Sequence, residues 1–449
     1  FLDEIEQVPS KVMDQCLAGN TLIRTLRGYI EVKDVEIDDF VIRADGYYGR
    51  VLAKSERPAR TVKLKVMGHE ALRLTTTHPL FAARSYRSGR FDRHGKPIKR
   101  TRLGWSRIGW STLEDIACEI KRYGVYTPKV RERIKSPIVD LNPYLPKAYR
   151  VENNTARAYF MPHPNSRALP SPLSKPIKTL IAVDRNLAWL LGLWLAEGSA
   201  SEYRHLSFGY NQKETDIRDK ALEVLKFHQI GQPCLWSAGN EGCQISVGNA
   251  VWANYLRRAA GVRRQRQIPV SWLEWPSEFQ FELLLGYLVG DGHIRKNGGL
   301  CANSSSRPLA YGIRELFYRL DCPATMGTFF HGGNPQWVVR VPPTFSEQFT
   351  AEIHRRFPSK LYRPPHSINA QHKGKKFLDG FIWHIMTIQN GIDETVYNLE
   401  VDGGSYLANG LAVHNCDALS GAYNELISGS WSAHEEIVSS YGSYDQPDW

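Results

Sequence analysis

Two apolar runs of the same pattern constrain this chain more than any other feature of its sequence. Residues 190–198 read LLGLWLAEG and residues 284–292 read LLGYLVGDG. Each run carries two small residues four positions apart: Gly192 and Ala196 in the first, Gly286 and Gly290 in the second. On a helix, positions four apart share one face, and a stripe of small residues lets two helix backbones approach closely. We therefore expect two helices that pack against each other along these stripes.

Each run ends with an acidic residue followed by glycine. Glu197 precedes Gly198, and Asp291 precedes Gly292; glycine at this place is typical of a left-handed helix end. The two carboxylates are then expected to lie side by side, at helix ends that are already negative. A cation is needed to hold them together, and their oxygen ligands indicate Mg²⁺. Such an ion can activate water and stabilise a leaving oxygen.

These runs resemble the signature of the LAGLIDADG homing endonucleases. The resemblance implies an α+β endonuclease domain with a pseudo-twofold internal duplication, in which Glu197 and Asp291 are the catalytic metal ligands. It also implies that the sheets after each helix form a saddle over the DNA major groove. The segments expected to contact DNA are residues 201–210, 234–247, 301–306 and 326–341. The sequence assigns no catalytic lysine.

The charge of the chain is consistent with a nucleic-acid partner. The formal net charge is +11, a balance typical of proteins that bind nucleic acid. Two basic clusters stand out, residues 84–102 and 257–266, although each can equally be a solvated loop. The seven cysteines form no CxxC pair, which argues against a zinc site or a disulfide framework.

A second feature lies at residues 412–416, which read AVHNC. The Asn415 side chain can attack its own backbone carbonyl and break the chain, and the Cys416 thiol can carry an acyl group. His414 places a proton donor just before this bond. Far upstream, Cys16 opens the run CLAGNTLIRTLRGYI, and residues 74–81 read LTTTHPLF.

In this order the runs resemble an intein, a self-splicing insertion within a host protein. The resemblance implies the horseshoe-like all-β Hint fold that inteins share with hedgehog autoprocessing domains. It implies that Cys16 attacks the carbonyl of Gln15 to form a thioester. His78 is expected to protonate the leaving nitrogen, and Thr75 to stabilise the oxyanion.

The later steps involve the other end of the insertion. The resemblance implies that the acyl group passes from the thioester to Cys416. Asn415 then cyclises to a succinimide with help from His414, and the two host pieces rearrange to a peptide. None of these steps requires a cofactor, because each exchanges one acyl bond for another.

The expected fold class is therefore multidomain, with an all-β Hint splicing domain interrupted by the endonuclease domain. The expected order along the chain is a host fragment (1–15), the first part of the splicing domain (16–150), a linker (151–178), the endonuclease (179–350), a basic linker (351–380), the second part of the splicing domain (381–415) and a second host fragment (416–449).

Two positions depart from the intein pattern. Inteins of this type often carry Asp in a YDL triplet, where this chain has Asn398, and a His near the position of Gly404. Asn398 can form hydrogen bonds but cannot act as a base. We therefore expect splicing to be slow.

The expected partners follow from the same resemblance. They are double-stranded DNA carrying the host gene without the insertion, and the host protein itself. Residues 1–4, FLDE, resemble the end of a Walker B strand, which makes a phage or microbial ATPase one candidate host. No apolar run is long enough to span a membrane, and we expect a cytoplasmic monomer.

Three alternatives remain open at this point. The chain can be a hedgehog-like autoprocessing domain that cleaves without ligation. It can be a splicing-competent intein whose degenerate nuclease only binds DNA. It can also be a DNA-binding protein that neither cuts nor splices.

Overall fold

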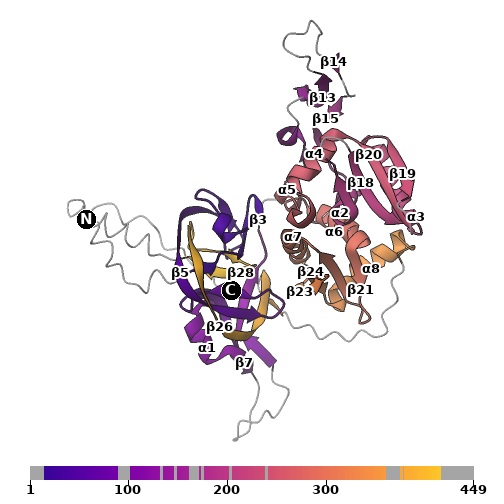
Figure 1. Ribbon diagram of the computed structural model, residues 1–449. Coiled ribbons are helices and arrows are strands. Elements are labelled where there is room, and N and C mark those ends of the chain that lie inside the picture. The colour runs from indigo at the N-terminus through magenta and orange to yellow at the C-terminus, as the bar shows by residue number, and fades with distance from the viewer. Residues whose placement is uncertain are drawn as a thin grey trace, which may run out of the picture.

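The structure is a computed structural model that describes residues 15–88, 102–131, 135–145, 149–160, 171–172, 176–201, 205–237, 241–360, 375–377 and 379–415. Most of both expected host fragments, with Cys416, and much of the basic cluster 84–102 lie outside these residues. Most of the described residues form two bodies that lie side by side (Figure 1). We call them the β body, residues 15–131 and 375–415, and the α/β body, residues 176–360.

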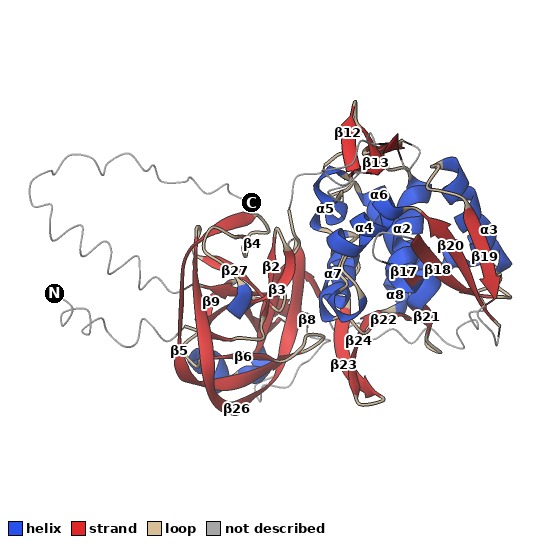
Figure 2. Ribbon diagram, turned by 45° about the horizontal axis from the view of Figure 1, so that its top comes forward, coloured by secondary structure: helices blue, strands red, loops and turns tan. Residues whose placement is uncertain are grey.

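The β body is built from both ends of the chain. Its 14-stranded sheet contains β1 (Leu17–Ala18), β2 (Leu22–Thr25), β3 (Gly28–Glu31), β4 (Phe40–Ile42), β5 (Tyr48–Val66), β6 (Leu72–Leu74), β7 (Pro79–Ser88), β8 (Arg102–Trp105), β9 (Gly109–Thr112), β10 (Tyr123–Pro128), β25 (Lys375–Phe377), β26 (Gly380–Val401), β27 (Ser405–Ala408) and β28 (Leu411–His414). A short helix, α1 (Leu113–Cys118), begins at Thr112, whose side chain caps it. Figure 2 shows the strands wrapped around a common interior.

Two long strands, β5 and β26, organise this sheet. The sequence runs VLAKS (51–55) and TVKLKVM (61–67) predict two shorter strands in place of β5, and WHIMTI (383–388) and TVYNLEV (395–401) predict two in place of β26. These predictions are wrong, because each pair of runs belongs to one continuous strand. The long strands pair with each other along most of their length, and the irregular positions appear as three register shifts in the ladder. β-Bulges of this kind bend a strand and increase its twist without ending it.

The α/β body consists of two repeats with the same order of elements. The first contains α2 (Arg185–Glu197), β17 (Gly198–Ala200), β18 (His205–Asn211), α3 (Thr215–Phe227), β19 (Pro233–Ser237), β20 (Gly242–Gly248) and α4 (Ala250–Ala259); the second contains α6 (Ser277–Asp291), β21 (Gly292–Ile294), β22 (Leu300–Ser304), α7 (Arg307–Arg319), β23 (Thr325–His331), β24 (Asn334–Val341) and α8 (Pro343–Arg356). The sheet orders are β17-β18-β20-β19 and β21-β22-β24-β23. The same topology in both halves confirms the internal duplication. A short helix, α5 (Val270–Leu273), precedes the second repeat.

The helices α2 and α6 pack backbone to backbone, as the small-residue stripes predict. A Cβ atom added to Gly192 would collide with the carbonyl of Leu283, and one added to Gly286 would collide with the carbonyl of Trp189. Glycine is therefore required at the crossing point of both helices.

The prediction of left-handed helix ends is wrong. Gly198 and Gly292 both have φ of −86° and extended conformations. Glycine is needed at both positions because a larger residue does not fit. A Cβ would collide with the preceding helical turn, at Trp194 for Gly198 and at Leu288 for Gly292.

The expected linkers contain secondary structure. Residues 149–178 include β12 (Tyr149–Glu152), β13 (Thr155–Phe160), β14 (Ser171–Pro172) and β15 (Ile177–Lys178), which form a small sheet, and β11 (Ile138–Asp140) pairs with β16 (Leu180–Ala182). Helix α8 continues to Arg356, beyond the expected domain end at residue 350. Among the described residues, no helix is long and apolar enough to cross a membrane.

Candidate functional site

Cys16 lies at the start of β1, buried and opposite the turn that follows β6. Its backbone N–H donates to the hydroxyl oxygen of Thr75 at 3.0 Å, and the backbone N–H of Thr75 donates to the Cys16 carbonyl at 3.0 Å. The two residues are thus joined by reciprocal hydrogen bonds. The nitrogen bound by Thr75 is the nitrogen of the Gln15–Cys16 peptide bond.

His78 closes the same turn and is fully buried. Burial lowers the pKa of its imidazole to about 3, and the backbone of Gln15 opposes this shift. The backbone of Gln15 therefore lies near the ring, and its carbonyl is the backbone group that could accept from a charged imidazole. Among the described residues, neither ring nitrogen has a hydrogen bond of normal geometry. The ring is therefore neutral at pH 7 and adjacent to the carbonyl of the upstream junction.

Asn415 follows β28 and is also buried. Its side-chain amide donates to the Val401 carbonyl at 3.1 Å, and its backbone N–H donates to the Gly404 carbonyl at 3.1 Å. The Nδ1 atom of His414 lies 2.7 Å from the Asn415 carbonyl oxygen. A carbonyl can only accept, so this nitrogen carries the proton. It polarises the carbonyl that cyclisation of Asn415 would attack.

The turn between β6 and β7 connects the two junctions. Strand β1 pairs with β6, and β28 pairs with β7 through Val413 and Leu80. His414 is close enough to His78 to lower its pKa further. The structure therefore brings together five of the six splicing residues expected from the sequence. Cys416, the sixth, lies outside the described residues.

The two positions that depart from the intein pattern both lie at this site. Strand β1 pairs with β26 so that Leu17 faces Tyr397, which places Cys16 opposite Asn398. The Oδ1 atom of Asn398 is buried and, within the described residues, has no hydrogen-bond partner. Gly404 has φ of +74°, and a Cβ there would lie 3.6 Å from Nε2 of His414.

A residue that the sequence did not reveal packs against His414. The ring of Trp110, on β9, meets the imidazole edge-on at 4.8 Å between centroids. No local pattern marks this tryptophan, because β9 reaches the site only through its pairing with β7.

A second site lies where helices α2 and α6 end. A Cβ added to Gly290 would lie 2.9 Å from Cγ of Glu197, so the acidic side chain rests against the neighbouring helix. Burial and the nearby Glu197 raise the pKa of Asp291 to about 7. Burial also raises the pKa of Glu197, against the effect of Lys360. The expected pair of carboxylates is therefore present, in surroundings that disfavour the charged form of each.

Two basic residues border this pair. Arg266 donates to the carbonyls of Leu195 at 2.9 Å and Gly198 at 2.6 Å, which are at the negative end of α2. Lys360 donates to the Gly290 carbonyl at 3.2 Å and forms an ion pair with Glu214 at 3.1 Å.

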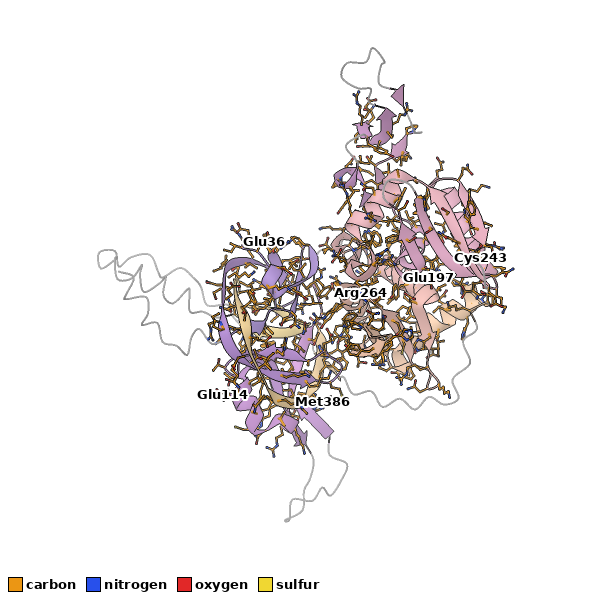
Figure 3. The ribbon with its side chains drawn as sticks, in the orientation of Figure 1. Glu36, Glu114, Glu197, Cys243, Arg264 and Met386 are labelled. Carbon is orange, nitrogen blue, oxygen red and sulfur yellow. The ribbon has the colours of Figure 1, made fainter. Side chains whose placement is uncertain are left out.

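The sequence did not reveal Lys360. It lies within the segment expected to be a basic linker, far from either helix along the chain. Arg266 was expected as part of a basic cluster for DNA, whereas its side chain binds the protein backbone. Arg264 of the same cluster lies on the side of the α/β body that faces the β body (Figure 3).

The donor set of this site fits a hard divalent cation. Burial raises the pKa values of both carboxylates, and Glu197 raises that of Asp291 further, so a bound cation would stabilise their charged forms. The described residues contain no group of three or more His, Cys, Asp or Glu side chains that could hold a metal. Glu197 and Asp291 would therefore bind an ion that keeps several waters, as Mg²⁺ does.

A comparison with protein families identifies part of the α/β body. Residues 278–341 match the family model of the LAGLIDADG-like domain. The match runs from helix α6 to strand β24 and includes Asp291. The chain thus contains a LAGLIDADG-like domain.

Two curated relatives are distant and longer. The ATP-dependent DNA helicase Hel308 of Thermococcus kodakarensis is 23% identical over 424 residues, which cover 89% of this chain and 36% of the relative. An iron-sulfur cluster assembly SufBD family protein of Mycobacterium leprae is 24% identical over 312 residues, which cover 67% of this chain and 31% of the relative. The chain spans about a third of the length of these relatives.

Similar solved structures include I-DmoI in complex with DNA and Ca. It is 12% identical and covers 38% of this chain and 88% of its own, with a TM-score of 0.31. The N-terminal LAGLIDADG domain of DUF199/WhiA is 13% identical and covers 41% of this chain and 86% of its own, with a TM-score of 0.29.

Proposed function

We propose that this chain is a self-splicing element, Cys16 to Asn415, that carries a DNA endonuclease. The observation that supports splicing most strongly is that each predicted junction is hydrogen-bonded by a residue of the expected type. Thr75 binds the nitrogen of the Gln15–Cys16 bond, and His414 binds the carbonyl of Asn415. Both of these hydrogen-bonded pairs lie next to the turn between β6 and β7.

In the first step the Cys16 thiolate forms a C–S bond to the Gln15 carbonyl carbon, and the Gln15–Cys16 C–N bond breaks. The contacts favour roles opposite to those expected from the sequence. Thr75 holds the nitrogen that becomes the leaving amine, while the neutral His78 faces the carbonyl, where a ring N–H can stabilise the oxyanion. The amine takes up the proton that the thiol has lost.

In the later steps the acyl group moves to Cys416 and the downstream bond breaks. Nδ2 of Asn415 must leave the Val401 carbonyl and attack its own carbonyl carbon, which expels the Cys416 amine. The hydrogen bond from His414 to that carbonyl oxygen makes the carbon more electrophilic. Trp110 keeps the imidazole in the orientation that this bond requires.

The curated relatives support an inserted element. A DNA helicase and an iron-sulfur assembly protein are unrelated in function, yet each resembles most of this chain over only about a third of its own length. A segment that moves between host genes accounts for this pattern more simply than a shared helicase or assembly activity does.

For the endonuclease, we propose that Glu197 and Asp291 hold Mg²⁺ at the base of the helix pair. The bound ion supplies an activated water and stabilises the leaving oxygen. Lys360 adds positive charge beside the carboxylates, where the scissile phosphate would lie. The sheets of the two repeats would contact the duplex on either side.

Variants that block one junction at a time test the splicing proposal. Asn415→Ala should stop release at the downstream end, while dithiothreitol should still cleave at Cys16 by attacking the thioester. Cys16→Ala should retain only slow cleavage after Asn415. The double variant should stay intact on a gel, and ligated product from it would refute these assignments.

A duplex that encodes residues 1–15 joined directly to 416–449 tests the nuclease. Cleavage at the joint with Mg²⁺, and its loss in Asp291→Asn, is the expected result. Binding without cleavage would instead favour a degenerate nuclease, and neither binding nor cleavage would contradict the proposal.

A further inference from the structure

The two repeats of the α/β body differ most clearly in one pair of corresponding helices. Helix α3 of the first repeat buries a single apolar face. Helix α7, its counterpart, buries residues 309–318 without interruption, including Arg314 and Glu315. The additional buried face of α7 is covered by the β body (Figure 1).

Polar and aromatic contacts fill this interface. Glu315 forms a buried ion pair with Arg24 of the β body at 2.9 Å. Tyr311 packs against Tyr29 with 5.3 Å between ring centroids. Buried charges are costly unless they are paired with good geometry, so the bodies are held in one relative orientation.

At the first turn of α7, Arg307 contacts three separate turns of the β body. Its Nε donates to Glu70 at 2.8 Å, and one terminal nitrogen donates to the backbone carbonyl of Asn20 at 2.7 Å. The other terminal nitrogen donates to the side chain of Asn409 at 3.4 Å. Asn409 in turn accepts from the backbone N–H of Leu22 at 2.9 Å.

Each of these turns adjoins a strand whose far end carries splicing residues. Asn20 follows β1, which begins just after Cys16. Glu70 precedes β6, which leads to the Thr75–His78 turn. Asn409 precedes β28, which leads to Asn415.

We propose that Arg307, a residue of the endonuclease-like body, is a positioning residue for protein splicing. The proposal rests on the splicing function proposed above. One planar guanidinium fixes the positions, along their axes, of the three strands that carry the two junctions. Arginine suits this role because its donors form a rigid fork, whereas lysine has a single charged nitrogen.

The physical reason is the sensitivity of acyl transfer to geometry. Strands are stiff along their axes and rise about 3.3 Å per residue, so a shift at the turn is transmitted to the junction. A misplacement of about 1 Å can slow a reaction by roughly a hundredfold. The transfer from Cys16 to Cys416 requires both junctions at once and is therefore the step most exposed to such a shift.

Loss of the guanidinium should leave the chain folded. Cavities of about 440 and 340 Å³ border Arg307, so a shorter side chain opens the turns to water and creates no sealed void. Glu70 keeps hydrogen bonds from Tyr311 at 2.9 Å and Trp337 at 2.8 Å.

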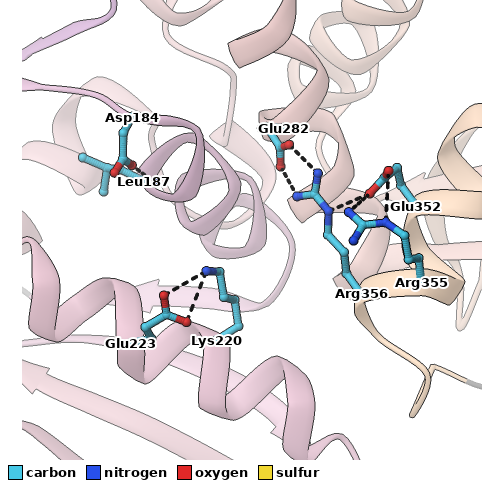
Figure 4. A network of polar contacts seen from close by, with 8 residues as sticks. All are labelled: Asp184, Leu187, Lys220, Glu223, Glu282, Glu352, Arg355 and Arg356. Carbon is cyan, nitrogen blue, oxygen red and sulfur yellow. Dashed lines mark hydrogen bonds and ion pairs between the residues drawn. The ribbon is translucent and has the colours of Figure 1, made fainter.

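The test compares Arg307→Met and Arg307→Lys with Arg356→Met in the full chain. Arg356 forms a partly buried ion pair with Glu282 at 2.8 Å inside the α/β body (Figure 4), and it contacts no splicing strand. Intact mass spectrometry follows ligated product and single-junction cleavage products over time, with dithiothreitol added to capture the thioester.

Arg307→Met is expected to reduce the rate of ligation at least tenfold, while thioester cleavage continues and its share of the products rises. Arg307→Lys should recover part of the ligation, and Arg356→Met should behave as the parent chain does. The same product ratio in Arg307→Met as in the parent would overturn the proposal. So would an equal loss of all products in Arg307→Met and Arg356→Met, which indicates a stability effect alone. Failure of the parent chain to splice would instead contradict the proposed function.

Discussion

At the scale of single residues, His78 and His414 occupy different environments that match different tasks. His78 is buried beside the Gln15 carbonyl and stays neutral, because burial lowers the pKa of its ring to about 3. His414 is partly buried, with Nδ1 donating to the carbonyl of Asn415. Their place in the sequence indicated that both act in proton transfer, but not that one of them is held neutral.

The low pKa of His78 predicts a specific acid sensitivity. In the unfolded chain this histidine takes up a proton near pH 6.5, and in the folded chain it does so only near pH 3. Its contribution to stability is therefore present above pH 6.5 and is lost as the pH falls toward 3. Between pH 7.5 and 4.5 the loss should be about 3 kcal/mol.

His78→Gln should remove this loss, measured by denaturant unfolding in the intact Cys16→Ala/Asn415→Ala background. His331→Gln, at an exposed residue of the β23–β24 hairpin, is the control and should leave the pH dependence unchanged. Identical pH profiles for the His78 variant and its parent would contradict the assignment.

Lys360 carries a prediction for the nuclease. Its positive charge lies near both carboxylates and lowers their pKa values. Lys360→Met should reduce the rate of DNA cleavage by about a hundredfold, in the range found for removal of one electrostatic group, with little effect on duplex binding. Single-turnover cleavage is the measurement. Lys220→Met, which removes an exposed ion pair on α3, should cleave normally.

Motifs reveal residues that act next to one another in the chain. Thr75, His78 and Asn415 could be predicted for this reason. Lys360 and Trp110 could not, because each reaches its site from an element whose own pattern has no relation to the chemistry. Their positions depend on tertiary packing.

At the scale of elements, the crossing of α2 and α6 determines the geometry of the carboxylate pair. Gly286→Ala would place a methyl group against the Trp189 carbonyl, and neither backbone can move without separating the helices. The variant should lose about 1–3 kcal/mol of stability and most DNA cleavage. Splicing should persist, because the residues at the two junctions lie in the β body and Arg307 lies on α7, which is neither of the crossing helices.

Thermal unfolding and cleavage assays check this prediction. Gly248→Ala is the matched control, since a Cβ there meets nothing within 4 Å. Equal cleavage by the two variants would contradict the role given to the crossing.

Sequence patterns predicted the elements of the α/β body better than those of the β body. Gly192 and Gly286 mark the crossing because close packing demands small residues at fixed spacing. Strands β5 and β26 were each predicted as two strands, because a bulge interrupts the local pattern while the ladder continues. The extended conformation of Gly198 also has no local signal, since glycine is permitted in either conformation.

At the scale of the whole molecule, helix α7 joins two bodies whose buried apolar residues form one continuous cluster. The ion pairs with Arg24 and Arg319 outweigh burial and hold the pKa of Glu315 at about 2. The stabilisation from this carboxylate is therefore present above about pH 4.5 and is lost as the pH falls toward 2.

Glu315→Gln should separate the unfolding of the two bodies. Removing one partner of a buried ion pair costs about 3–5 kcal/mol of stability. Here the loss weakens the contact between the two bodies. Calorimetry of the Cys16→Ala/Asn415→Ala chain should show one transition, and the additional Glu315→Gln change should produce two. Glu223→Gln, in an exposed ion pair, should leave one. A single unshifted transition in Glu315→Gln would contradict the role of α7.

The sequence predicted that one domain interrupts another, but not how they dock. From the sequence alone, charged residues of α7 such as Arg314 fit the polar face of an ordinary amphipathic helix. In the structure the β body covers this face.

The central claim is that the two junctions, far apart in sequence, react with each other at the Thr75–His78 turn. Intact mass spectrometry of the freshly purified full chain over time tests it most directly. We expect two new species: residues 1–15 joined to 416–449, and a Cys16–Asn415 fragment that ends in a succinimide. A chain that keeps its full mass indefinitely, with Cys16 as a free thiol, would contradict it.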